Sequence, residues 1–257
     1  MTGCDRLNYK IYKYESLDST NTKAKELALR GAGEATLVIC EEQTRGRGRM
    51  GRSWTSTKGK DLLFSIILKP KLEFGELQRI ILAAAVAVNR ALKDLGIESQ
   101  IKWPNDIIIG GKKVAGILME TSTSGDKTKH VILGIGINVN QDREDIPDEL
   151  KDKSISLKLV SKREIDREEL LDYLLVRIKE SYLAVKNRVD MEELLKAYKE
   201  NSSLTGREVM VLQGKARPRR GTAIDIGING ELVVRFPEGV EKISYGEVSI
   251  RGIDGYT

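Results

Sequence analysis

The chain is poor in the side chains from which many active sites are built. It has one histidine, His130, and two cysteines, Cys4 and Cys40. This inventory excludes a cysteine and histidine zinc cluster and a disulfide scaffold. It also leaves His130, which we expect to be a strand-edge residue, as the sole possible centre of a Ser-His-Asp or Cys-His arrangement. Chemistry here is therefore expected to depend on charge stabilisation and positioning.

Long hydrophobic runs and aromatic residues are also scarce. No apolar stretch approaches the roughly 20 residues that a membrane helix needs, and residues 1–13 lack the apolar segment of a signal peptide. We therefore expect a cytoplasmic protein with no membrane partner. Aromatic residues make up 5% of the chain, few for stacking on bases. The net charge of +5 is the small excess of 43 basic over 38 acidic residues, so positive charge is a local feature.

Positive charge is concentrated in residues 45–54, here called the arginine loop. Arg45, Arg47, Arg49 and Arg52 are separated by three glycines. Arginine offers a planar fork of donors that matches phosphate or carboxylate, and glycine lets backbone amides turn inward. Neighbouring like charges repel one another, so we expect a bound anion to be the reason for the cluster. The anion is either a nucleic-acid backbone or the phosphates of a small nucleotide.

Neither of the two common nucleotide-binding loops is present. Gly46, Gly48 and Gly51 have the spacing of a dinucleotide-binding fingerprint, but the segment continues toward Trp54 as an extended chain instead of opening a helix. The P-loop pattern with its terminal Gly-Lys-Ser/Thr is also missing from the sequence.

Periodicity predicts an α+β fold with two domains. Hydrophobic spacing and caps predict helices over residues 20–30, 77–95, 166–187 and 190–200, the last two opened by capping boxes at Asp166 and Asp190. Apolar runs predict strands over residues 37–40, 62–68, 101–103, 107–109, 114–119 and 131–140. After Asn201 only short strands follow (209–212, 221–226, 232–236, 240–244 and 248–250). We therefore divide the chain into domains 1–201 and 202–257, the second a small barrel.

Three more polar segments lie beside expected strand ends or helix starts, where α/β proteins commonly place a ligand cleft. Residues 19–21 are either helix caps or ligand contacts. Residues 102–106 combine a rigid Trp-Pro wall with an Asn-Asp pair. Lys112 and Lys113 precede a strand and are either a solvated hairpin tip or part of the site. Gly134 and Gly136 leave one side of their strand bare, so that a ligand or another backbone can approach closely.

In order and spacing, these segments resemble the biotin protein ligases. The resemblance runs from about Tyr12 to Gly252, and the arginine loop together with Lys102-Trp103-Pro104-Asn105-Asp106 is its most specific part. It implies a mixed β-sheet catalytic domain flanked by helices, like the class II aminoacyl-tRNA synthetases, followed by an SH3-like β-barrel. About a dozen residues precede the catalytic domain, as in the monofunctional form without an N-terminal DNA-binding domain, so a repressor role and a nucleic-acid partner are not expected.

The resemblance implies a two-step reaction. Biotin and MgATP give biotinyl-5′-AMP and pyrophosphate, and a lysine of a biotin carboxyl carrier protein then attacks the mixed anhydride. Catalytic roles are implied for Arg49, Lys113 and Asp106. Contacts to biotin are implied for Ser19, Thr20, Asn21, Gln43, Gly46, Arg47, Gly48, Arg49, Lys113 and Gly116. Contacts to the nucleotide are implied for Arg49, Arg52, Trp54, Asn105, Lys113 and Asn138.

Other interpretations stay open at this point. Trp54 and Trp103 either wall the pocket or belong to the core. A lipoate ligase would share the adenylation chemistry, and a nucleic-acid-binding module would also use an arginine loop beside a small β domain. The magnesium ligands and the oligomeric state stay open as well, a homodimer being one option.

Overall fold

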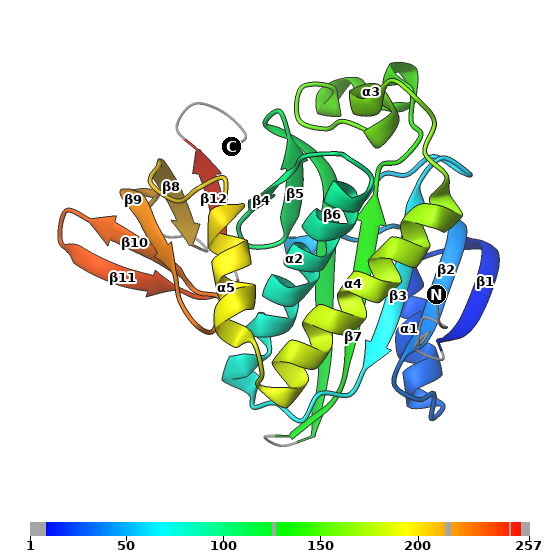
Figure 1. The fold of residues 1–257 in the computed structure, drawn as a ribbon, viewed down its shortest axis with the longest axis horizontal. Helices are drawn as coiled ribbons and strands as arrows, with labels where there is room; N and C mark the ends of the chain where they lie inside the picture. Colours follow the sequence, from blue (N-terminus) through cyan, green and yellow to red (C-terminus); the bar gives the residue numbers. More distant parts are fainter. Residues whose placement is uncertain (1–8, 125–126, 214–216, 247, 253–257) are drawn as a thin grey trace.

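The fold was analysed in a computed structural model that describes residues 9–124, 127–213, 217–246 and 248–252 (Figure 1). Cys4 and the outermost residues of both predicted domains lie outside these ranges. No helix in the described part of the chain is both long and apolar enough to cross a membrane.

A seven-stranded mixed sheet forms the centre of the molecule, in the order β1-β2-β3-β7-β6-β5-β4. Strands β1 and β2 are parallel, and every other neighbouring pair is antiparallel. The strands are β1 (Lys10–Leu17), β2 (Thr36–Gln43), β3 (Leu62–Leu68), β4 (Gln100–Lys102), β5 (Asp106–Ile109), β6 (Lys112–Ser124) and β7 (Lys127–Ile137). The predicted mixed sheet is confirmed.

Alternation along the strands divides the apolar residues between two faces of this sheet. Val38, Ile67 and Ile132 pack with Ala24 of the first helix, whereas Leu37 and Ile66 join the larger core on the other face. Both faces are covered because consecutive side chains of these strands are apolar.

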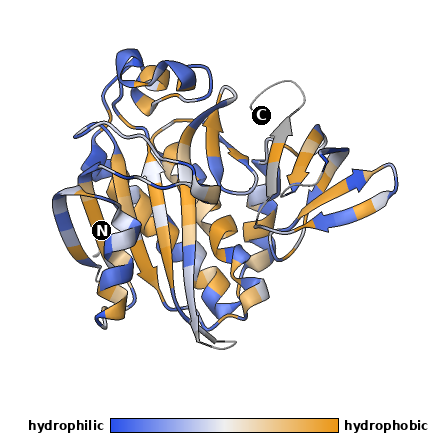
Figure 2. Cartoon of the chain, turned by 180° about the vertical axis from the view of Figure 1, so that it is seen from behind, coloured by the Kyte–Doolittle hydropathy of each residue, from blue (hydrophilic) through white to orange (hydrophobic). Residues whose placement is uncertain are grey.

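Helix α1 (Thr20–Leu29) covers the first face of the sheet (Figure 1). Helix α2 (Gln78–Asp94) covers the second face, and α4 (Arg167–Asn187) packs against α2. Helix α5 (Met191–Glu200) packs against α2 and leads into the C-terminal sheet. Figure 2, from behind, shows α1 on the near side of the sheet. A short helix α3 (Leu157–Ser161) and the 3-10 turns η1 (Arg49–Gly51), η2 (Phe74–Glu76), η3 (Arg143–Asp145) and η4 (Asp148–Leu150) complete the helical elements of the described chain.

The C-terminal part is a five-stranded antiparallel sheet with the order β11-β10-β9-β8-β12. Its strands are β8 (Glu208–Gln213), β9 (Arg219–Ile226), β10 (Leu232–Phe236), β11 (Gly239–Ile243) and β12 (Val248–Gly252), and the predicted Asn229–Gly230 turn joins β9 to β10. Among the described residues β11 does not pair with β12, so the predicted barrel is observed as a sheet without a closing ladder.

Three details of the sequence prediction were wrong or incomplete. Strand β1 was missed because it is an exposed edge strand whose charged residues mask its alternation. Asp190 makes no cap hydrogen bond, because the tight turn between α4 and α5 holds it at φ 53°, whereas Asp166 accepts from two amides as expected. His130 lies inside β7 instead of at a strand edge. Burial inside β7 lowers the pKa of its imidazole.

Candidate active site

One cavity of about 880 Å³ lies at the end of the central sheet where α1 begins and β2 ends. Segments that are far apart in the sequence meet there. Of the residues predicted to form the site, Gly46 alone is not part of the lining. The lining includes Ser19, Thr20, Asn21, Gln43, Arg47, Gly48, Arg49, Arg52, Trp54, Asn105, Asp106, Lys113, Gly116 and Asn138.

Buried polar side chains at the start of α1 form a network at one end of this cavity. The Thr20 amide donates to Gln43 Oε1 at 2.8 Å, and Asn21 Nδ2 donates to Glu120 Oε2 at 2.7 Å. Ser65 Oγ lies 2.7 Å from Thr20 Oγ1 and 2.6 Å from Asn21 Oδ1. Ser19 occupies the cap position but makes no side-chain cap bond, so capping alone does not explain this segment.

The network contains two residues that sequence reasoning missed. Ser65 is a fully buried hydroxyl within the otherwise apolar strand β3, and that isolation was a usable signal. Glu120 lies on β6, and no motif marked it. Its carboxylate also pairs with Arg47 at 3.2 Å, so it connects α1 to the arginine loop.

Gly116, Gly134 and Gly136 form a strip of bare backbone, here called the glycine strip, which lines the cavity and which the side chains of Asn21 and Trp54 approach closely. The approach of a ligand to this strip stays a prediction. A Cβ on Gly134 would lie 2.0 Å from Asn21 Oδ1, and one on Gly136 would lie 2.7 Å from the Trp54 ring. Gly116, which pairs with Gly136, also faces that ring. The three glycines therefore allow Asn21 and Trp54 to lie directly on the sheet.

Lys113 and Asp106 form an ion pair inside the cavity. The Lys113 Nζ atom lies 2.6 Å from Asp106 Oδ1, and about a quarter or less of either side chain is exposed. The pairing of β5 with β6 shifts its register between Ile107 and Ile108. This shift lies between the position of Asp106 and that of Lys113. The Lys113 ammonium also lies 5.3 Å from the centre of the Trp54 ring. Two of the three predicted catalytic residues, Lys113 and Asp106, therefore contact each other.

The arginine loop folds back on itself as a small hairpin. The Trp54 amide donates to Gly46 O at 2.9 Å, and the Gly48 amide donates to Arg52 O at 2.7 Å. Met50 and Gly51 make the turn with positive φ values of 55° and 73°. A Cβ on Gly46 would lie 2.5 Å from Trp54 O, so Gly46 serves the close approach of the two loop arms.

The side chains of Arg47 and Arg49 have protein partners, so for these two a structural role stands beside the expected anion. Arg47 donates to Thr22 Oγ1 at 3.0 Å and to Glu120. Arg49 donates to Asn105 Oδ1 at 3.3 Å and to Gly246 O at 2.8 Å, and it stacks 4.3 Å from the Tyr245 ring centre. Burial lowers the pKa of Arg49, but a guanidinium stays charged. Arg45 and Arg52 are exposed.

The remaining predicted residues differ in whether they line the cavity. Asn105 Nδ2 donates to Ile117 O at 2.7 Å, and Asn138 Nδ2 donates to Ile155 O at 3.2 Å, so both amides are held at the cavity wall. Trp103 is buried and also lines the cavity, and its Nε1 donates to Gly230 O beside the C-terminal sheet at 2.8 Å. The Lys112 amine donates to Lys151 O and is not part of the cavity lining.

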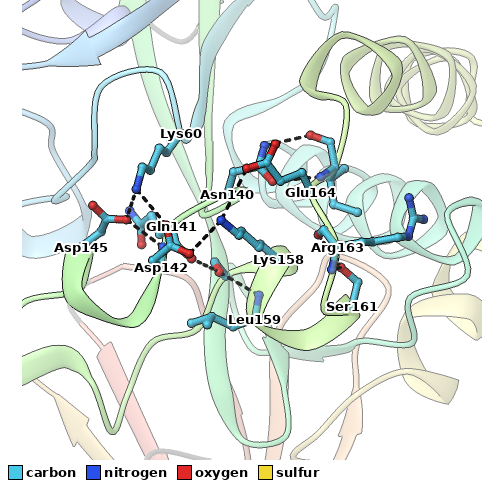
Figure 3. Close-up of polar contacts among 12 residues, drawn as sticks. Lys60, Asn140, Gln141, Asp142, Asp145, Lys158, Leu159, Ser161, Arg163 and Glu164 are labelled. Carbon is cyan, nitrogen blue, oxygen red and sulfur yellow. Dashed lines mark hydrogen bonds and ion pairs between the residues drawn. The ribbon is translucent and has the colours of Figure 1, made fainter.

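A buried carboxyl supports the far wall of the cavity. Asp61 Oδ2 accepts from the Thr57 amide and from Gln141 Nε2, both at 2.7 Å. Burial raises the pKa of Asp61 to about 6, and these two hydrogen bonds offset part of the rise. Its neighbour Lys60 pairs with Asp142 and Asp145 (Figure 3). The turn after the arginine loop is thus fastened to the segment that follows β7.

Comparison with known proteins places this geometry in a family. Residues 14–138 match the Biotin/lipoate A/B protein ligase family. The fold superposes with a TM-score of 0.81 on a biotin protein ligase from Aquifex aeolicus in complex with biotin and ATP, at 32% identity over 95% of this chain and 99% of that one. The chain belongs to the biotin protein ligase family.

Curated members of the family align over part of their length. The bifunctional ligase/repressor BirA of Bacillus spizizenii is 47% identical over 157 residues, which are 61% of this chain and 48% of that protein. The biotin--[acetyl-CoA-carboxylase] ligase of Paracoccus denitrificans is 39% identical over 125 residues, or 48% of this chain and 51% of that protein. The chain thus spans about half the length of these two relatives.

Proposed function

We propose that this protein is an ATP-dependent ligase that activates biotin as biotinyl-5′-AMP and transfers it to a lysine of a biotin carboxyl carrier protein. The observation that carries the proposal is the meeting of a buried polar cluster, a lysine–aspartate pair and an arginine loop in one cavity. The Aquifex aeolicus relative, which binds biotin and ATP, supports it.

In this proposal the buried polar end of the cavity holds the biotin ring system. Ser19, Thr20, Asn21 and Gln43 offer hydroxyl and amide groups to the ureido end, where fixed donors and acceptors select a polar head. The hydrogen bonds of Thr20 with Gln43 and of Asn21 with Ser65 hold these side chains in place before the ligand arrives. Gly116 permits close approach, and the loop segment Gly46, Arg47, Gly48 and Arg49 closes over the ligand.

Adenylation brings two anions together, and this requires positive charge. A biotin carboxylate oxygen attacks the α-phosphorus of ATP, the bond from that phosphorus to the β-phosphate oxygen breaks, and pyrophosphate leaves. Lys113, Arg49 and Arg52 stabilise the negative charge that develops at phosphorus. Asn105, Asn138 and Trp54 contact the nucleotide, and magnesium enters with the ATP phosphates.

Transfer needs a neutral amine. The carrier lysine nitrogen attacks the acyl carbon of the mixed anhydride, AMP leaves with the electron pair of the carbon–oxygen bond, and the nitrogen loses a proton. Asp106 orients this amine by accepting its hydrogen bond once Lys113 has moved to the adenylate. The contact of 2.6 Å between Asp106 and Lys113 supports this role, because Lys113 is proposed to bind the adenylate.

We further propose a cytoplasmic enzyme with catalytic residues 1–201 and an accessory domain 202–257. In this scheme the C-terminal sheet contributes to the nucleotide or carrier side of the cavity. A homodimer is compatible with the proposal, and no nucleic-acid or membrane partner is required.

The test is an adenylation assay with purified protein, biotin and MgATP. Pyrophosphate release that depends on biotin, followed by labelling of a carrier domain, is the expected result, and no release on adding biotin would rule the proposal out. Lipoate as a competitor separates the alternative ligase activity, which the name of the matched family includes. Tight, salt-sensitive DNA binding without biotin would instead favour a nucleic-acid-binding module.

The first variant to test is Lys113→Ala. It should slow adenylate formation by about 2–4 kcal/mol of barrier, the usual loss on removing one charge-stabilising donor. Lys112→Ala is the matched control, because the neighbouring amine is absent from the cavity lining and donates to Lys151 O. Equal activity of the two variants would remove Lys113 from the mechanism.

A further inference from the structure

Arg49 connects the arginine loop to the C-terminal sheet. Its guanidinium lies over the ring of Tyr245, with 4.3 Å between the central carbon and the ring centre, and donates to the neighbouring Gly246 carbonyl at 2.8 Å. The opposite side of the guanidinium reaches Asn105 Oδ1. Arg49 therefore bridges the cavity wall and a segment almost 200 residues later in the chain.

Tyr245 is held in place by the catalytic domain. Its amide donates to Gln78 Oε1 at 2.9 Å, and Gln78 Nε2 donates to Gly230 O at the β9–β10 turn. Trp103 Nε1 donates to the same carbonyl. The amide of Gln78, at the start of α2, thus fixes two segments of the C-terminal sheet at once.

Tyr245 lines a second cavity of about 410 Å³, which the arginine loop from Arg47 to Arg52 also lines. Arg49 lines both this cavity and the main one. Stacking on a fixed aromatic ring restricts a guanidinium that otherwise has many rotamers. The Tyr245 ring therefore adds a stacking contact to the hydrogen bonds that Arg49 donates to Asn105 and to the Gly246 carbonyl.

We propose that Tyr245 is a positioning residue that holds Arg49 over the main cavity and so slows release of the adenylate. The inference rests on the proposed function for its ligand, but the position of Arg49 in the free protein can be tested separately. Tyr245 acts only through Arg49, and this sets it apart from a residue that merely stabilises the C-terminal sheet.

The experiment measures how fast biotinyl-5′-AMP leaves the enzyme after rapid gel filtration. Tyr245→Leu should release it roughly 5- to 30-fold faster, the range expected for loss of a partly buried cation–π contact. Tyr245→Phe keeps the ring face and should release it at the wild-type rate. Phe236→Leu, which alters a buried aromatic residue of the same sheet, is the matched control and should not change release.

A double-mutant cycle with Arg49→Lys decides whether Tyr245 acts through Arg49. Lysine keeps the charge but cannot stack as a plane, so Arg49→Lys alone should also speed release, and Tyr245→Leu should add less than about twofold to it. Full additivity, or wild-type release from Tyr245→Leu or from Arg49→Lys, overturns the inference. Because Arg49 lies outside the C-terminal sheet, the Arg49→Lys variant leaves every residue of that sheet unchanged.

Limited trypsin digestion of the ligand-free protein tests the same contact without the reaction. Cleavage within the arginine loop should be several-fold faster in Tyr245→Leu than in wild type or Phe236→Leu, because the loop has lost its anchor. Equal cleavage overturns the inference. If the wild-type protein forms no biotinyl-5′-AMP, the proposed function fails by itself, and digestion still decides the role of Tyr245.

Discussion

At the scale of single residues, the site depends on contacts too close to tolerate one added carbon atom. Asn21 Oδ1 occupies the space where a side chain at position 134 would begin. The same oxygen lies 2.6 Å from Ser65 Oγ, and the Asn21 amide nitrogen is held by Glu120. A small change at Gly134 therefore propagates to three partners.

Gly134→Ala should displace Asn21, because the new Cβ would lie 2.0 Å from its Oδ1 atom. We expect the KM for biotin in the adenylation assay to rise by about tenfold or more, since overpacking of this kind costs roughly 1–3 kcal/mol. Gly33→Ala is the matched control, with no atom within 4 Å of its added Cβ. Equal KM values for both variants would contradict the placement of Asn21.

Asp61 should make stability depend on pH. Its folded-state pKa of about 6 lies above the ordinary 3.8, so the folded protein binds this proton more tightly. The stabilisation is complete below about pH 4 and is lost as pH rises to about 6, by up to roughly 3 kcal/mol. In urea unfolding, the free energy of unfolding of Asp61→Asn should therefore rise relative to that of the wild type from about pH 4 to 7.

The matched control for this pH dependence is Asp172→Asn, an exposed carboxylate on α4. It should follow the wild-type profile at every pH. If the difference in the free energy of unfolding between wild type and Asp61→Asn were the same at every pH, the Asp61 carboxyl would have an ordinary pKa. That is not expected of a group that is fully buried.

At the scale of elements, the arginine loop is a hairpin fastened at two points. Its own backbone hydrogen bonds close the hairpin, and Arg47 and Arg49 attach it to Glu120 and Tyr245 respectively. Regular elements were predictable because 3.6-residue and two-residue periods are properties of neighbouring residues. The loop anchors were not, since both partners lie more than 70 residues away in the chain.

Glu120→Ala should loosen the hairpin at its Arg47 anchor. This ion pair is partly exposed and worth no more than about 1 kcal/mol, so trypsin cleavage in the arginine loop should rise by roughly two- to fivefold. The control is Glu168→Ala, which removes the exposed pair with Lys13 at a distant position. Loop cleavage at the control rate would show that Glu120 does not hold the loop.

At the scale of the whole molecule, a few polar contacts attach the C-terminal sheet to the elements around the central sheet. Trp103, Gln78 and Arg79 all reach the Asn229–Gly230 turn, and Lys199 pairs with Asp225 at 2.7 Å. The apolar core is also continuous between the two sheets. Trp103 was predicted as a pocket wall or core residue; it is buried and lines the cavity, and its indole also connects the two parts of the molecule.

Trp103→Phe should lower the melting temperature. It removes the N–H that donates to Gly230 O and leaves a smaller ring in a buried site, at a cost of about 1–3 kcal/mol. For a chain of this size that corresponds to a fall of roughly 2–12 °C in a thermal scan. Tyr12→Phe on the edge strand β1 should not change it, and equal melting of both variants would contradict the linking role.

The sequence by itself determined the α+β class, most strand and helix positions and the set of segments that form the site. These properties follow from local periodicity, turn chemistry and the spacing of a few motifs. Tertiary structure alone decided that Ser65 and Glu120 support Asn21, that Trp54 lies on the glycine strip, that Asp61 is buried and that Tyr245 stacks on Arg49. Each of these features depends on strand register and on the packing of the two sheets, which bring together residues that are distant in the sequence. Neither register nor packing can be predicted from residues that are neighbours in the chain.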